Sequence, residues 1–266
     1  MSAEIGIIGG SGFYSLLSDA ETVEVETEYG APSSPITVGD FNGRRVAFIA
    51  RHGAKHTIPP HKVPYKANIA ALDSLGVKRI VTTNAVGSLS PKYKPGDFAL
   101  LDQFVNMTHG RDDTFFHSNP VVHISTADPY CHELRGVASR AFDKLHINAH
   151  KTATVVVVNG PRFSTKAESR FYSSMGFDLI NMTQYPEVVL AKEKRMCYLG
   201  IAIVTDYDVG LEGQTDVEPV TFEQVSKIFG ENMSRIKGIM GEIVSSTPKE
   251  QGCNCRNSLD GAVVSN

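Results

Sequence analysis

The sequence predicts an α/β fold, a single domain with a mixed, largely parallel central β-sheet flanked by helices. Strand-like runs rich in β-branched residues alternate with helix-like segments along the chain. Several strand-like runs, such as residues 154–158, are continuously apolar, a pattern typical of strands that are covered on both faces. The 266 residues contain no internal repeat and no break in composition, so we expect one large domain.

The expected elements follow from these patterns in chain order. Strands are expected at 4–9, 36–41, 45–51, 79–84, 98–105, 152–159, 178–181 and 197–206. Helices are expected at 66–75, 131–145, 166–175, 186–194 and 221–244. The last helix carries apolar residues at spacings of three and four, which predicts an amphipathic helix. Residues 1–247 are assigned to the domain, and 248–266 to a polar tail that is expected to be mobile.

Composition excludes several classes of partner. The net charge is −3 at pH 7, which gives no electrostatic support for binding nucleic acid or an anionic membrane. No apolar run approaches the roughly 20 residues that span a bilayer. The N-terminus has no basic region followed by a long apolar region, so it does not resemble a signal peptide, and we expect the protein in the cytoplasm.

The four cysteines are scattered along the chain. Cys131 and Cys197 stand alone, whereas Cys253 and Cys255 form a Cys-x-Cys pair in the tail. In a cytosolic chain these are expected to be free thiols, and disulfides become an alternative if the source is a hyperthermophile. No CxxC pair exists and no histidines cluster beside the tail pair, so this spacing does not predict a zinc site.

A glycine cluster, Gly9-Gly10-Ser11-Gly12, follows the first apolar run. A dinucleotide-binding G-x-G-x-x-G would need a third glycine where Ser15 stands, and residues 15–22 are short for a crossover helix. A P-loop would need a lysine that is absent here. Two interpretations remain: a tight turn with positive φ, or a loop whose amides and Ser11 hydroxyl bind an oxyanion.

Five further strand ends carry small, polar or charged groups. Arg51 and His52 follow one strand, and a guanidinium with an imidazole suits a tetrahedral oxyanion, although a basic surface loop would have the same composition. Ligand sites in open α/β sheets form outside the carboxyl ends of strands. The coincidence of polar strand ends therefore predicts one site. The other strand ends are at 82–88, where a Gly-containing turn is expected, and at 159–164, 181–187 and 205–208.

Together these stretches resemble a known family, the trimeric class of purine nucleoside phosphorylases and most closely the 5′-methylthioadenosine phosphorylases. The resemblance extends from Ile5 to about Val244. Each motif is modest by itself, and their order along the chain makes the match specific. The motifs are GIIGGSGFY, RHGAKHTIPPHKV, TTNAVGSL, PGDF, GPRFST, NMTQYPEVVLAKE and TDYD.

The resemblance implies that free inorganic phosphate attacks C1′ of a purine nucleoside. Phosphate is then a co-substrate, and neither a cofactor nor a metal is expected. Met182 is expected to pack near the ribose, with core filling as the alternative, and Asn181 is expected to contact the nucleoside. Several charge-assisted hydrogen bonds would offset the desolvation of a dianion. The phosphate ligands implied by the matching motifs are Ser11, Arg51, His52, the backbone amide of Ala85, and Thr183.

The base is expected to meet two carboxyl groups. Relatives that prefer 6-oxopurines carry Asn where this chain has Asp206, and a carboxyl there can accept from the adenine N6 amine or, when protonated, donate to N7. Asp208 would accept from the amine or orient Asp206, with a helix N-cap or a surface loop as the alternative. Phe163 would stack on the base or sugar. The resemblance therefore gives Asp206 and Asp208 the catalytic roles.

The 5′ end of the nucleoside distinguishes substrates. A methylthio group needs an apolar pocket, for which the matching residues are Val220, Phe222 and Val225. His123 matches a histidine that this family supplies from a neighbouring subunit, which implies a homotrimer or a hexamer of two trimers. Phosphorolysis of 5′-methylthioadenosine is the leading hypothesis. The alternatives are a phosphorylase of adenosine, inosine, guanosine or methylthioinosine, and a non-catalytic sensor that binds NAD or ATP.

Overall fold

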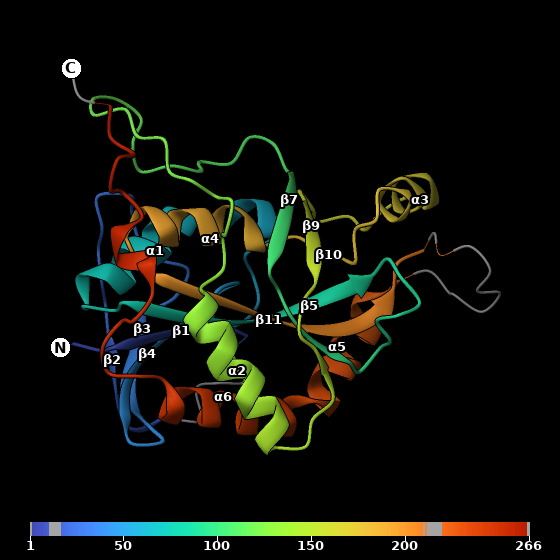
Figure 1. Ribbon diagram of the computed structural model, residues 1–266, viewed down its shortest axis with the longest axis horizontal. Helices are drawn as coiled ribbons and strands as arrows, with labels where there is room; N and C mark the ends of the chain where they lie inside the picture. The colour runs from blue at the N-terminus through green and yellow to red at the C-terminus, as the bar shows by residue number, and fades with distance from the viewer. Residues whose placement is uncertain (1, 11–16, 210, 212–219, 265–266) are drawn as a thin grey trace.

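The structure is a computed structural model that describes residues 2–10, 17–209, 211 and 220–264. These residues form one 11-stranded sheet with helices packed on both faces (Figure 1). The strands are β1 (Ile5–Gly9), β2 (Ser18–Val23), β3 (Ile36–Phe41), β4 (Arg44–Ala50), β5 (Arg79–Ser88), β6 (Phe98–Leu100), β7 (Gln103–Met107), β8 (Ala149–His150), β9 (Thr154–Val158), β10 (Leu179–Asn181) and β11 (Cys197–Tyr207). The helices are α1 (Tyr65–Ser74), α2 (His132–Lys144), α3 (Lys166–Ser174), α4 (Gln184–Glu193), α5 (Phe222–Glu231) and α6 (Met233–Ser246), with 3₁₀ turns at Pro60–Lys62 and Asn254–Asn257.

The sheet is mixed and mainly parallel, as the sequence predicts. Its main path runs β2-β3-β4-β1-β5-β10-β9-β7, and β11 pairs with β5 and continues through β6 to β8. The pairs of β1 with β4 and β5, of β9 with β7 and β10, and of β11 with β5 are parallel. In contrast, β10 is antiparallel to β5. The sheet therefore branches at β5, its central strand.

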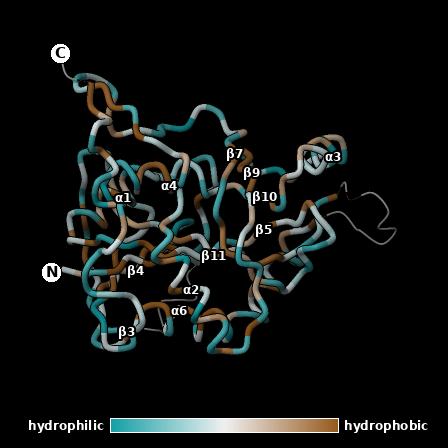
Figure 2. The backbone as a smooth tube through the Cα atoms, viewed as in Figure 1, coloured by the Kyte–Doolittle hydropathy of each residue, from teal (hydrophilic) through white to brown (hydrophobic). Residues whose placement is uncertain are grey.

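Two apolar clusters cover the two faces of the sheet. One joins the sheet to α1 and α4, and the other joins it to α2 and α6. Strands buried on both sides explain the continuous apolar runs, because neither face meets water. In Figure 2 the hydrophobic segments run through the interior strands, whereas most surface loops are hydrophilic or neutral.

Left-handed residues end the helices that pack on the sheet. Gly76 follows α1 with φ of 83°, and Gly176 follows α3 with φ of 79°. A residue in this conformation turns the chain away and lets its amide bond the last carbonyls of the helix, and glycine adopts it without strain. His146 and Arg195 serve the same purpose after α2 and α4 at φ of 52° and 59°.

The expected strand 98–105 is in fact two strands with different partners. β6 pairs with β11 and β8, whereas β7 pairs with β9. The chain changes partner at Asp102, whose carboxylate accepts the Ala153 amide at 3.1 Å. An apolar run does not reveal which neighbour each half will meet. The sequence also missed β2, which is polar and exposed, and the two-residue β8.

The expected helix 221–244 is likewise two helices. Asn232 ends α5 and precedes α6, and its side chain donates to the Ile228 carbonyl at 2.9 Å. α6 buries apolar residues in the core, whereas α5 has no buried residue. The hydrophobic spacing continues through the break, so periodicity alone could not place it.

Two further expectations were wrong. Strand β5 does not end at Asn84 but continues to Ser88, so the stretch interpreted as a Gly-containing turn is extended and pairs with β11. The described part of the tail packs on the body: Cys253 and Cys255 contact the core beside α2, and Val263 forms a bridge with Val122.

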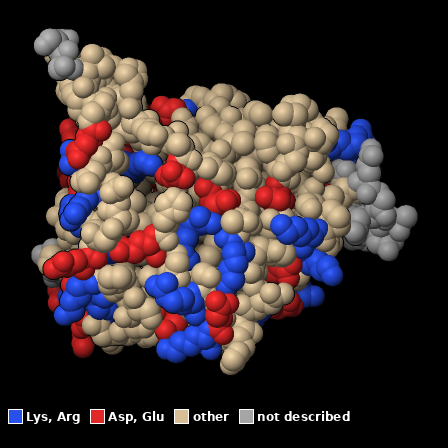
Figure 3. Space-filling model, viewed as in Figure 1, with Lys and Arg blue, Asp and Glu red and all other residues tan. Residues whose placement is uncertain are grey.

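The surface charges and the helices of the described residues are consistent with the small net charge and the short apolar runs of the sequence. On the face shown in Figure 3, basic and acidic side chains are interspersed, in keeping with the small net charge. Within the described ranges, no helix is both long and apolar enough to cross a membrane.

Candidate active site

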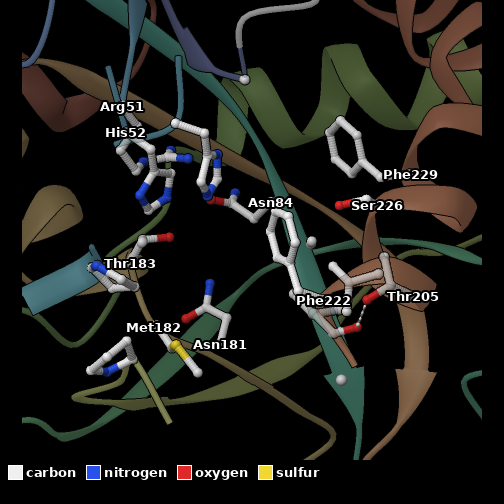
Figure 4. Close-up of a pocket in the computed structure, with 18 of the residues that line it drawn as sticks. Arg51, His52, Asn84, Asn181, Met182, Thr183, Thr205, Phe222, Ser226 and Phe229 are labelled. Carbon is white, nitrogen blue, oxygen red and sulfur yellow. Dashed lines mark hydrogen bonds between the residues drawn. The ribbon is translucent and has the colours of Figure 1, made fainter. Parts of the chain in front are cut away.

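A cavity of about 730 Å³ lies where several strand ends meet α5. Its walls come from the ends of β4, β10 and β11, from the second half of β5, and from α5. Figure 4 shows Arg51 and His52 on one side of this cavity, Phe222, Ser226 and Phe229 on the other, and Asn84 between them. The cavity therefore has a cationic end and an apolar end.

The branching of the sheet creates this cavity. On one edge of β5, the register with β1 ends at Thr82, and β10 begins to pair only at Gly87. Between these positions that edge of β5 has no strand partner among the described residues. Because β10 is antiparallel to β5, its carboxyl end returns toward the gap and brings Asn181, Met182 and Thr183 there. Backbone groups at the edge of β5 are left to meet a ligand.

Arg51 is held from behind by a buried carboxylate. Its Nε and Nη2 donate to the two oxygens of Glu187 at 2.7 and 2.8 Å, a bidentate pair. Tyr198 adds a hydroxyl hydrogen bond to Glu187 at 2.6 Å. Arg51 lines the cavity and Glu187 does not, so the third guanidinium nitrogen, Nη1, is the one left for a ligand. Its contact with the Thr83 carbonyl is long, at 3.4 Å.

His52 is a neutral imidazole with a defined tautomer. Its Nδ1 lies 2.8 Å from the Ile58 carbonyl, which can only accept, so Nδ1 carries the hydrogen and Nε2 the lone pair. Burial, followed by the charge of Arg51, lowers the pKa of His52 to about 4. The ring stacks on His56 at 4.5 Å between centroids. At neutral pH, Nε2 of His52 is therefore placed to accept a hydrogen bond from an anion beside Arg51.

Thr183 and Ala85 complete the cationic end. Thr183 stands at the N-cap position of α4, yet its hydroxyl makes no capping hydrogen bond and faces the cavity. Ala85 lies on the unpaired edge region of β5 and is half-buried. A hydroxyl and a helix N-terminus both favour an anion.

Asp206 is turned into the cavity by an irregularity in β11. The register of β11 against β5 shifts between Val204 and Asp206, and such a bulge redirects the side chains that follow it. The Thr205 hydroxyl donates to Asp206 Oδ1 at 2.7 Å, shown as the dashed line in Figure 4. Burial raises the pKa of Asp206 to about 6, and the Thr205 hydrogen bond opposes this rise. Asp206 can therefore carry a proton close to neutral pH.

Asp208 exposes less of its surface than Asp206 does. Burial raises its pKa, and hydrogen bonds from Ser169 and Ser164 lower it. Its second oxygen, Oδ2, is buried without a hydrogen-bond partner among the described residues. Since buried polar atoms are nearly always satisfied, this oxygen is available to a ligand in the cavity.

The middle of the cavity holds two asparagines with unused polar atoms. Within the described residues, both side-chain atoms of Asn181 and Oδ1 of Asn84 are buried without partners. Met182 lies beside them, in the space left by Gly160: a Cβ at Gly160 would be 2.5 Å from the Met182 sulfur. Unused donors and acceptors beside an apolar thioether suit a ligand with both hydroxyls and a carbon framework.

Arg111 fixes the loops that carry these groups. Its guanidinium donates to the carbonyls of Asn159 at 3.0 Å and Met182 at 2.8 Å, and also to the Tyr185 carbonyl. The loops after β9 and β10 are thereby tied together. Sequence reasoning gave no role to Arg111 or Glu187, because each acts through contacts with residues distant in the chain.

The opposite wall of the cavity is mainly apolar, with Ser226 of α5 as a hydroxyl group on it. The α5 side chains Phe222, Val225 and Phe229 face it, and Phe222 lies 5.4 Å from His56 between ring centroids. The apolar stripe of this amphipathic helix therefore covers the cavity, and Phe229 also packs against the core. Phe163 lines the cavity from the loop after β9 and is 38% exposed.

All but three of the predicted site residues line this cavity. Ser11 lies outside the described residues. Val220 is buried but is not part of the lining. His123 is exposed and lies beside the tail, where its amide donates to the Ala262 carbonyl at 2.8 Å, so it does not reach the cavity of its own chain. Cavity residues that the sequence did not single out include His56, Thr83, Asn84, Ser226, Phe229 and Met233.

The cavity lining contains no cluster of metal-ligating side chains within the described part of the chain. The one such cluster found there consists of the four cysteines, which do not line the cavity. The chemistry available in the cavity is therefore that of an anion held by Arg51, a base at His52, and two protonatable carboxyls.

Comparisons with known proteins agree with this geometry. A family model described as the phosphorylase superfamily matches residues 4–245. The S-methyl-5′-thioadenosine phosphorylase of Thermofilum pendens is 49% identical over 98% of both chains, and that of Pyrococcus furiosus is 46% identical over 96% of this chain and 97% of its own.

Solved structures of methylthioadenosine phosphorylases are also similar to this chain over most of its length. A methylthioadenosine phosphorylase from an antarctic soil metagenomic library superposes with a TM-score of 0.90 at 39% identity, over 99% of this chain and 93% of its own. A mutant of the Schistosoma mansoni adenosine/methylthioadenosine phosphorylase, in complex with methylthioadenosine, has a TM-score of 0.87 at 35% identity, over 94% and 93%. The chain therefore belongs to the phosphorylase superfamily, and the two curated relatives named above, which it matches over nearly their full length, are S-methyl-5′-thioadenosine phosphorylases.

Proposed function

We propose that the protein cleaves 5′-methylthioadenosine with inorganic phosphate, giving adenine and 5-methylthioribose 1-phosphate. The observation that carries this proposal is the polarity of one cavity: a guanidinium and a neutral imidazole at one end, a carboxyl with a pKa of about 6 farther along, and an apolar wall on α5. These features match the three parts of the substrates, namely phosphate, purine and methylthio group.

The phosphate end would position the nucleophile. Nη1 of Arg51, the Thr183 hydroxyl and the Ala85 amide would hold the dianion beside C1′, and holding the reactants together accounts for much of the rate. As the bond from C1′ to N9 breaks, its electron pair goes to the purine while a phosphate oxygen bonds C1′. The positive charge that develops on the sugar is stabilised by the adjacent phosphate.

One proton moves from phosphate to base in the overall reaction. Monohydrogen phosphate loses its proton as its oxygen bonds C1′, and Nε2 of His52, which accepts its hydrogen bond, passes that proton to solvent, from which Asp206 regains the one it donates. The departing adenine gains one proton, which a protonated Asp206 would donate at N7. With a pKa of about 6, roughly a tenth of these carboxyls carry that proton at pH 7. Asp208 Oδ2 would accept from the N6 amine.

The apolar wall supports a methylthio group over a hydroxyl at the 5′ position. Phe222, Val225 and Phe229 give a 5′-hydroxyl no hydrogen-bond partner, and a hydroxyl buried against them loses binding free energy unless it reaches Ser226. His123 lies away from the cavity of its own chain and matches a histidine that similar proteins supply from a neighbouring subunit, so we also infer a homotrimer, or a hexamer of two trimers, in which a neighbour's histidine completes each site.

A panel of nucleosides assayed with and without phosphate tests the proposal. Methylthioadenosine should release adenine only when phosphate is present, and with a higher kcat/KM than adenosine, inosine or guanosine. Release without phosphate would mean hydrolysis, and no release would refute the assignment. A higher kcat/KM for inosine would favour a 6-oxopurine nucleoside phosphorylase. Native mass spectrometry of the same preparation tests the oligomer, with a monomer refuting the shared site.

A further inference from the structure

Four cysteines distant in the sequence converge at one place in the fold. Cys131 is the N-cap residue of α2, Cys197 is the first residue of β11, and Cys253 and Cys255 come from the tail. Their four Sγ atoms all lie within 4.8 Å of one another. They are the only cysteines of the chain, and all four are free thiols in the structure. Three separate segments of the chain therefore bring all four cysteine sulfurs together at one place.

The spacing of the sulfurs suits a tetrahedral ion. A Zn–S bond of about 2.3 Å places the corners of a ZnS₄ tetrahedron roughly 3.8 Å apart. The sulfurs of Cys197 and Cys253 are 3.3 Å apart, and the largest separation is within 4.8 Å, so the observed range brackets this value. Shifts of less than about an ångström would bring all four to one centre. Two disulfides would need only two separate pairs, not four mutually close sulfurs.

The surroundings favour a group that carries negative charge. Cys131 and Cys197 are buried, and the two tail cysteines are half-buried against the core. Gln251 donates its side-chain amide to the Cys197 sulfur at 3.2 Å, the kind of outer contact that orients a metal ligand. The half-buried ammonium of Lys192 is close enough to interact electrostatically with Cys255 and Cys131. Four thiolates around a divalent cation carry a net charge of −2. The Lys192 ammonium would partly offset this negative charge.

We propose that Cys131, Cys197, Cys253 and Cys255 form a structural Zn²⁺ site that fastens the C-terminal tail to α2 and β11. Four protein ligands leave no open position, so the site is structural and not catalytic. Binding converts four thiols to thiolates and releases four protons to solvent, with no change in oxidation state. The tail continues from Cys255 to Val263, which pairs with Val122 next to His123, so the ion would also fix the segment that carries this histidine.

The test measures metal content and does not depend on the enzyme activity. The full chain is purified with a mild reductant and without chelator, and zinc is determined by mass spectrometry. We expect one Zn²⁺ per chain, thiols that react with a disulfide reagent only after the ion is removed, and, after exchange with Co²⁺, the visible and thiolate charge-transfer bands of a tetrahedral tetrathiolate. Reduced protein that takes up neither Zn²⁺ nor Co²⁺ would overturn the proposal, whether its sulfurs are free or paired as disulfides before reduction.

Variants in the tail sharpen this test. The double variant Cys253→Ser/Cys255→Ser leaves both core cysteines in place and should lose at least about tenfold in bound zinc, with a lower melting temperature. Asn254→Ser is the matched control, since it changes the exposed residue between the two ligands and should keep one ion per chain. Stoichiometric zinc in the double variant would refute the ligand set. Adenine release by either variant is judged separately, so failure of the zinc site is distinguishable from failure of the phosphorylase assignment.

Discussion

Replacing Asp206 with Asn should stabilise the protein while it inactivates the enzyme. Burial raises the pKa of this carboxyl from 3.8 to about 6, so ionising it in the folded protein costs about 3 kcal/mol relative to the unfolded chain. Asn has the same shape, carries no charge, and keeps an oxygen for the Thr205 hydroxyl. At pH 8 we therefore expect the free energy of unfolding of Asp206→Asn to exceed that of the wild type by about 3 kcal/mol.

The pH dependence gives this prediction its sign. Below about pH 4 the carboxyl is protonated in both the folded and unfolded chains, and the substitution should be nearly neutral. As the pH rises from 4 to 6, the unfolded chain ionises first, so the wild type loses stability relative to the variant. Well above pH 6 the difference should be constant. This gain in stability at pH 8 should be accompanied by a loss of kcat of about 100-fold or more, because the departing adenine loses the general acid that would protonate its N7.

Urea unfolding at pH 4.5, 6 and 8, at one protomer concentration, measures the difference. Asp143→Asn is the control, because Asp143 is exposed on α2 and pairs with Lys151 only at the surface. Its substitution should change the free energy of unfolding by less than about 0.5 kcal/mol. Equal stability of Asp206→Asn and wild type at pH 8, or a difference that does not fall to about a third of its pH 8 value at pH 4.5, would refute the burial of an ionised Asp206.

Three other substitutions test the carboxylate behind Arg51, the space beside Met182 and the apolar wall, and a fourth, Glu193→Gln, is the matched control for the first. Glu187→Gln leaves a buried guanidinium without its carboxylate and should cost about 3 kcal/mol of unfolding free energy in phosphate-free buffer. Glu193→Gln, a buried glutamate with hydroxyl and amide partners, should cost less than about 1 kcal/mol. Gly160→Ala should lower kcat/KM about tenfold, because the new Cβ displaces Met182; unchanged kinetics would contradict that contact. Val225→Ser should raise KM for methylthioadenosine about fourfold relative to adenosine, and a parallel rise for both would argue against the apolar wall as the 5′ pocket.

The sequence predicted the location of the site better than its construction. Arg51, His52 and Asp206 were found because polar residues after apolar strands are recognisable locally, and the carboxyl ends of parallel strands meet at one edge of a sheet. Asn181 and Thr183 reach the same place for a different reason. Their strand, β10, is antiparallel to β5, and only the observed register shows that its end returns to the gap in the sheet.

The missing parts depend on contacts between residues far apart in the chain. Glu187 orients Arg51 across 136 positions, and no local pattern marks it as the partner of an arginine that lines the cavity. The cysteines are a similar case. Their spacing did not predict a metal site, since known zinc motifs place ligands in close pairs, and here two of the four ligands stand alone until the fold brings them together.

Gly87 lies in the TTNAVGSL motif and in strand β5, and its lack of a side chain leaves room for the Asp206 carboxylate. Its glycine was interpreted as part of a turn, but it lies inside β5, where it pairs with Asp206 across the bulge. A Cβ at this position would be 2.9 Å from Asp206 Oδ2 and 3.0 Å from the Ile180 side chain. Gly87→Ala should therefore displace the carboxyl and leave the phosphate end untouched, so kcat falls at least about tenfold while KM for phosphate stays within about twofold. A matching loss in phosphate affinity would mean that the alanine distorts β5 itself, and full activity would mean that Asp206 does not need this space.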